Sequence, residues 1–110
     1  MSLKRRWSLA GAESVLCDVR RHTEAAVQES EVLLARSREA SDPAEAARAA
    51  AALRRVLSRW LRAMEALGVE ARGPWRVEFE TGDGTYCWSW PDEDLAGFRD
   101  AEGGDPTPIQ

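Results

Sequence analysis

The stretch Ser41-Asp42-Pro43-Ala44-Glu45 (SDPAE) carries the signals that start a helix, and helix-forming segments stand on both sides of it. Asp42 suits the N-cap position, because its carboxylate can accept hydrogen bonds from the unpaired amides of the first turn. Pro43 suits the first helical position, where its missing N–H costs nothing. Glu45 falls at N3, where the side chain of a capping box reaches back to the backbone N–H of the N-cap residue. The stretch therefore predicts a turn followed by a second helix.

This second helix is predicted over 42–67, because apolar side chains recur there at spacings of three and four. Gly68 ends the pattern, and glycine tolerates the left-handed backbone that closes a helix. Its apolar arc consists of Ala46, Ala49, Leu53, Val56, Leu57, Trp60, Met64 and Leu67.

The segment before the turn is predicted as an amphipathic helix over 7–38. Ser8 is placed to cap its first turn, and the following apolar residues fall within an arc of about 120°. Because few residues separate the two helices, they must fold back as an antiparallel hairpin. Each apolar arc is wider than the seam of a two-helix hairpin. The C-terminal segment, a second subunit or both must cover the remainder.

After Gly73-Pro74 the hydrophobic period changes from 3.6 to 2, which indicates β-strands. With Asp83-Gly84 as a two-residue hairpin turn, Phe79 pairs with Trp88 and Val77 with Trp90. A short third strand, 95–98, then places Leu95 opposite Trp90. One face of the sheet collects Trp75, Val77, Phe79, Tyr86, Trp88 and Trp90.

These elements predict an α+β fold in a single domain, 1–110. A long antiparallel two-helix hairpin is followed by a small three-stranded antiparallel β-meander over 75–98. The tail over 99–110 has little to pack against and is expected to be loose.

The composition is that of a globular domain, with 44% hydrophobic and 31% charged residues and a net charge of -4. No apolar run approaches the roughly 18 residues that span a bilayer, and no secretion signal is recognisable, so a cytoplasmic protein without membrane insertion is expected. Charge is uneven. Residues 1–72 carry 13 basic and 10 acidic groups, or +3, whereas residues 73–110 carry 2 and 9, or -7.

The best candidate for a chemical or ligand site is the second face of the sheet, where the alternation places Glu78, Glu80, Cys87 and Phe98. A catalytic thiolate needs a nearby cation or base, whereas carboxylates raise the pKa of a thiol. The single histidine and two cysteines lack metal-site spacing, and no phosphate-binding loop is present. We therefore expect no catalytic residues, no metal and no cofactor, and a protein that is not an enzyme.

A stripe of arginines lies opposite the apolar arc of the second helix: Arg48, Arg55, Arg59 and Arg62. Most such stripes are solvated faces, and the overall acidic balance argues against nucleic acid as a partner. The acidic C-terminal segment, from the same chain or a neighbouring one, is the alternative partner for this basic stripe.

The chain resembles the bacterial family known as domain of unknown function 2203. The resemblance rests on Trp7-Ser8-Leu9, Gly68-Val69-Glu70 and Tyr86-Cys87-Trp88. In addition, Leu95-Ala96-Gly97-Phe98 approximates the family's last strand, and Thr107-Pro108-Ile109 approximates its C-terminal end. These short motifs span nearly the whole chain.

The chain departs from that family at its last strand, where Phe98-Arg99 replaces a common Trp-His pair. The family has no established activity, so the resemblance implies a fold and leaves the function open.

The leading functional hypothesis is a non-catalytic interaction or scaffold protein that acts as a homodimer or a higher homo-oligomer, with other protein partners possible. The alternative is a small-ligand-binding module that uses the aromatic face or the Cys87 face of the sheet.

Overall fold

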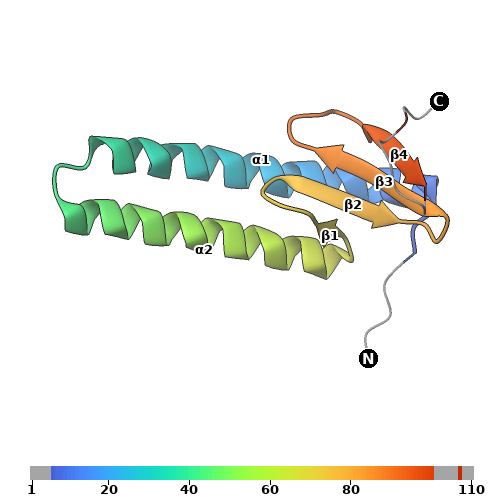
Figure 1. The fold of residues 1–110 in the computed structure, drawn as a ribbon, viewed down its shortest axis with the longest axis horizontal. Helices are drawn as coiled ribbons and strands as arrows, with labels where there is room; N and C mark the ends of the chain where they lie inside the picture. The colour runs from blue at the N-terminus through green and yellow to red at the C-terminus, as the bar shows by residue number, and fades with distance from the viewer. Residues whose placement is uncertain (1–5, 101–106, 108–110) are drawn as a thin grey trace.

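A computed structural model describes residues 6–100 and Thr107. Two helices are followed by a four-stranded antiparallel sheet in the order β1-β2-β3-β4 (Figure 1). The α+β fold is thus confirmed, with four strands where three were predicted. The elements are α1 (Leu9–Glu39), α2 (Pro43–Leu67), β1 (Glu70–Ala71), β2 (Arg76–Glu80), β3 (Gly84–Ser89) and β4 (Gly97–Asp100).

The helix ends follow the capping signals of the sequence. The Ser8 side chain caps α1, and the Asp42 carboxylate accepts a hydrogen bond of 3.0 Å from the amide of Ala44 at the start of α2. Pro43 opens α2, and Gly68 closes it in the left-handed conformation with φ 78°. The predicted start and stop of both helices are therefore confirmed to within two residues.

The sheet lies beside only one end of the hairpin, next to the beginning of α1 and the end of α2 (Figure 1). The other end projects beyond it, and we call this part, residues 27–57, the distal hairpin. The molecule measures 51 × 33 × 25 Å with a radius of gyration of 16.3 Å. A compact chain of this length would have about 13 Å. The distal hairpin makes the protein elongated.

The core lies between the sheet and the near end of the hairpin. The inner sheet face contributes Val77, Phe79 and Trp88, each at most 1% exposed. Aromatic contacts hold the layers together, because the ring of Trp7 stands edge-on to Phe79 with centroids 5.2 Å apart. The aromatic face predicted from the alternation is therefore an interior surface.

The β2–β3 register differs from the predicted one by two residues. Val77 pairs with Trp88, and Phe79 pairs with Tyr86. The two-residue turn is Gly82-Asp83, one position earlier than predicted, with Gly82 at φ 97°. The predicted Asp83-Gly84 turn is wrong. A shift of two preserves the period of the strand, so the apolar residues still share one face.

Gly84 belongs to β3 for a steric reason. A Cβ atom at this position would meet the backbone carbonyl of Arg99 and the ring of Phe98 on β4. Only glycine allows the two strands to approach this closely, so Gly84 serves the sheet rather than the turn.

The last strand is also placed differently from the prediction. β4 begins at Gly97, and Leu95 lies in the preceding connection with its side chain in the core. Phe98 pairs with Tyr86, and the ring centroids are 5.1 Å apart. Phe98 therefore lies on the face of Tyr86 and Phe79, and its predicted position beside Cys87 is wrong. Because the connection between Trp90 and β4 is longer than predicted, the side chains of β4 alternate in the opposite sense from the predicted one.

The predicted loose tail, 99–110, is wrong at its start and largely outside the described residues. Arg99 and Asp100 complete β4. Thr107 exchanges two backbone hydrogen bonds with Phe98, at 2.7 and 2.8 Å. Among the described residues, no helix is long and apolar enough to cross a membrane.

Candidate functional site

The outer face of the sheet points away from the hairpin and carries most of the polar side chains of the strands. Strand pairing places Glu78 directly opposite Cys87, and Glu80 opposite Thr85. Thr85 in turn pairs with Arg99 on β4. Arg99 thus occupies the face on which Phe98 was expected, so this face carries positive as well as negative charge.

Glu78 is held between two arginines. Its carboxylate accepts hydrogen bonds from Nε of Arg72 at 2.8 Å and from the guanidinium of Arg99 at 2.6 Å. Arg72 also contacts Glu70 at 3.0 Å. Burial alone would raise the pKa of Glu78, but the bonds to Arg72 and Arg99 outweigh it and hold that pKa below its ordinary value.

Cys87 is half-buried, and its surroundings keep the thiol protonated. Burial raises the pKa of Cys87, and the negative charge of Glu78 raises it further, against smaller opposite effects of Arg99 and Arg76. A reactive cysteine needs a lowered pKa. The outer face therefore does not favour nucleophilic chemistry at this thiol.

The outer face is hollowed next to Cys87 into a cavity of about 230 Å³, which we call the outer-face pocket. It was missed by sequence reasoning, which placed Glu78, Glu80 and Cys87 together but gave them no cation. Its polar and charged lining consists of Arg72, Arg76, Glu78, Cys87, Ser89 and Arg99.

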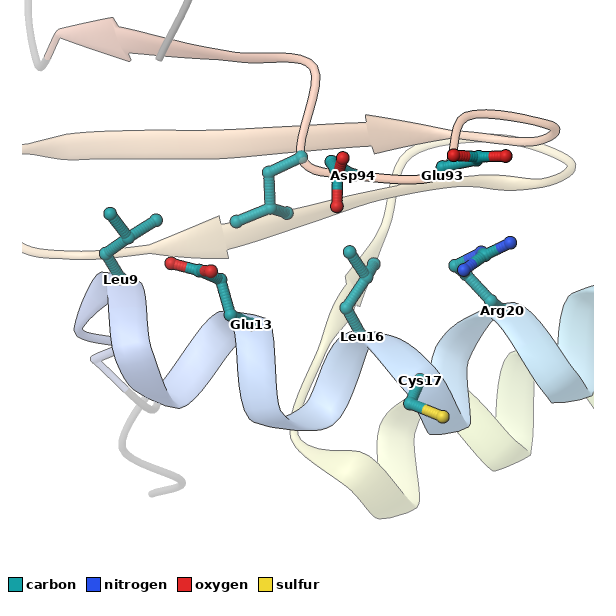
Figure 2. Close-up of a pocket in the computed structure, with 8 residues that line it drawn as sticks. Leu9, Glu13, Leu16, Cys17, Arg20, Glu93 and Asp94 are labelled. Atoms are coloured by element: carbon teal, nitrogen blue, oxygen red, sulfur yellow. The ribbon is translucent and has the colours of Figure 1, made fainter. Parts of the chain in front are cut away.

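A second pocket of about 350 Å³ lies between α1 and the connection before β4. Figure 2 shows Glu13 and Arg20 directed from α1 toward the segment that carries Glu93 and Asp94. Nε of Arg20 is buried without a hydrogen-bond partner. No group of three or more His, Cys, Asp or Glu side chains among the described residues could hold a metal ion. This pocket has an apolar floor and a charged rim, without a convergent catalytic set.

The basic stripe on α2 is exposed, as its sequence pattern suggests. Arg59 forms an ion pair with Glu29 of α1 at 2.9 Å, and both side chains are at least half exposed, so the pair adds little stability. Arg48, Arg55 and Arg62 have no ion-pair partner within the described part of the chain. No acidic side chain of residues 73–100 forms an ion pair with them.

Among the residues that the structure describes, the exposed large hydrophobic side chains are all on the hairpin. They are Val32, Leu34 and Leu61, with 53%, 41% and 41% of their surface exposed. Leu34 is 18 residues, or five turns, from Leu16, so it lies on the same side of α1. Leu16 and Leu95 line the same pocket between α1 and the connection before β4, so Leu34 marks the side of α1 on which the sheet lies. Val32 is on the opposite side.

No protein family, curated protein or solved structure matches the chain. The resemblance to domain of unknown function 2203 stays a prediction on these grounds, and the fold and its surfaces are the basis for a functional proposal.

Proposed function

We propose that the protein is a non-catalytic cytoplasmic interaction protein that self-associates through the distal hairpin, most simply as a homodimer. The observation that carries this proposal is the exposed side chain of Leu34. It lies on the same side of α1 as the sheet, but in the distal hairpin, beyond the part of α1 that the sheet covers. Half-buried Leu53 and Leu57 extend the apolar surface onto α2. Apolar surface without a covering layer is typical of an interface.

A second copy of the chain fits this surface by shape. The sheet of each copy occupies the near half of one side of its hairpin and leaves the distal half open (Figure 1). An antiparallel twofold pair of distal hairpins would form a four-helix bundle with one sheet at each end. The same patch then serves both copies, and each sheet lies beside the partner's hairpin tip.

The size of the distal hairpin agrees with that arrangement, and its charge does not oppose it. About fifteen residues of each helix, at a rise of 1.5 Å, present a face of roughly 22 by 20 Å. With additional contacts from the sheets, the interface approaches the roughly 800 Å² per partner of stable complexes. The distal hairpin, residues 27–57, carries five basic and five acidic residues, so its net charge is zero. Two copies of this face can therefore approach each other without a net charge repulsion.

Two matched substitutions on α1 test the proposal. Leu34→Glu places a charge on the proposed interface and is expected to weaken self-association at least tenfold, measured by sedimentation equilibrium. Val32→Glu makes the same kind of change two residues away on the opposite side and should leave association unchanged. Equal effects of the two variants, with helicity retained by circular dichroism, would exclude this surface as the interface.

A further inference from the structure

The basic residues of the C-terminal part of the chain converge on one place. After Arg62 the chain contains only three arginines and no lysine, against eleven acidic residues. These three, Arg72, Arg76 and Arg99, all line the outer-face pocket. They come from three segments: the connection after β1, the start of β2, and β4. The most acidic part of the protein therefore contains one locally positive cavity.

Two of the three guanidinium groups are fixed in position. Arg72 uses its Nε and one terminal nitrogen on Glu78 and Glu70, and Arg99 uses one terminal nitrogen on Glu78. Each guanidinium has five N–H donors, so both keep donors that are free for another acceptor. The Glu78 side chain, only 12% exposed, acts here as a positioning residue. Arginines held in this way lose little entropy when they bind an anion.

Arg76 supplies the charge that the carboxylates do not neutralise. It is exposed at the start of β2, and no ion pair to it is found among the described residues. The lining side chains carry three positive charges against the one negative charge of Glu78. Counting Glu70, which contacts Arg72, the sum is still positive by one. Glu80 also acts on Arg72, but it does not line the pocket. Ser89 pairs with Arg76 across the strands and adds a hydroxyl donor.

We propose that the outer-face pocket binds a small molecule through an oxyanion, a carboxylate or a phosphate group. Arginine recognises both groups with paired N–H donors. The cavity of about 230 Å³ is smaller than typical drug-sized sites of about 300–1,000 Å³, so it holds a compact anion rather than a nucleotide. The neutral Cys87 thiol at its wall does not repel this ligand. This site lies on the sheet and is separate from the proposed hairpin interface.

Nuclear magnetic resonance tests this site residue by residue. The ¹⁵N-labelled protein is titrated with sodium phosphate in one arm and sodium malonate in the other, each against sodium chloride of equal ionic strength. Saturable shifts of the backbone amides of Arg76, Cys87, Ser89 and Arg99 are expected in at least one arm, and the arm identifies the anion. Shifts that follow ionic strength alone, in both arms up to 50 mM anion, would overturn the proposal.

A pair of arginine substitutions completes the experiment. Arg76→Gln removes an exposed charge at the pocket and should weaken anion binding at least fivefold. Arg55→Gln removes an exposed charge from the basic stripe on α2 and should leave binding unchanged. Unchanged binding in the Arg76 variant, or an equal loss in both variants, would show non-specific attraction and refute the site.

Discussion

The indole nitrogen of Trp60 on α2 donates a hydrogen bond of 2.8 Å to the hydroxyl oxygen of Thr23 on α1, and both residues are buried. The hydroxyl in turn donates to the carbonyl oxygen of Val19 at 2.7 Å. Thr23 is the only buried polar residue among the described ones. Two groups that would be costly to bury alone satisfy each other, and the pair fixes the two helices relative to one another.

We expect Thr23→Val to destabilise the protein by about 1–3 kcal/mol, because the indole N–H of Trp60 would be left buried without an acceptor. Thr23→Ser keeps the hydroxyl and should cost less. Chemical denaturation of both variants measures the difference. If valine were tolerated as well as serine, the hydrogen bond would not contribute to stability.

The ion pairs of Glu78 predict a pH dependence of stability. The pKa of Glu78 is lowered in the folded protein from an ordinary value of 4.5, since Arg72 and Arg99 outweigh the effect of burial. Its contribution is therefore complete above pH 4.5 and is lost as pH falls through the lower, folded-state pKa.

Glu78→Gln tests this contribution. It should destabilise the protein at pH 7, and the difference from the wild type should shrink as pH falls below 4.5 and through the lower folded-state pKa of Glu78. Urea unfolding at pH 7 and at a series of lower pH values measures it. A difference that stays constant with pH would mean that the charge of Glu78 plays no part.

The two cysteines should differ in reactivity. Cys17 is exposed on α1, whereas Cys87 is half-buried and its pKa is raised by burial and by Glu78. Iodoacetamide should modify Cys87 about tenfold more slowly than Cys17 at pH 7.5 in the native protein. Cys17→Ser and Cys87→Ser isolate the two thiols, and the difference should vanish in urea. Alkylation of native Cys87 faster than that of Cys17 would support a catalytic role for the Cys87 thiol.

Two glycines offer a matched test of the sheet. Gly84→Ala should destabilise by about 2 kcal/mol or more, because its Cβ would meet the backbone of Arg99, which cannot move away easily. Gly73 has a positive φ of 128° but open space around it. Gly73→Ala should cost about 1 kcal/mol from backbone strain alone. Thermal unfolding compares the two, and an equal cost would contradict the close approach of β3 and β4.

The helices were predictable because their signals are local. Ser8, the Asp42-Pro43 pair and Gly68 each act within one helical turn. The β2–β3 register was not, because Gly82-Asp83 and Asp83-Gly84 are both plausible turn pairs and give the same apolar face. What selects between them is the close approach of Gly84 to β4, a contact distant along the chain.

The candidate site was predictable only in part. The alternation placed Glu78, Glu80 and Cys87 on one face of the sheet. Which side chains of the third strand share this face depends on the path of residues 90–96, which has no periodicity. That error placed Phe98 on the outer face instead of Arg99. The two-residue β1 is too short to show a period, so its pairing with Glu78 was not detectable either. The sequence shows that few basic residues follow Arg62, but only the fold brings these arginines together at the outer-face pocket.

The central claim is self-association through the hairpin, and the measurement that tests it most directly is the molar mass of the wild-type protein in solution. Light scattering is preferable to elution volume, because an elongated monomer with a radius of gyration of 16.3 Å elutes as a larger species. At concentrations near 50 µM we predict a mass of at least twice the 12.2 kDa of the chain. A constant mass of 12.2 kDa up to several hundred micromolar would contradict the proposal.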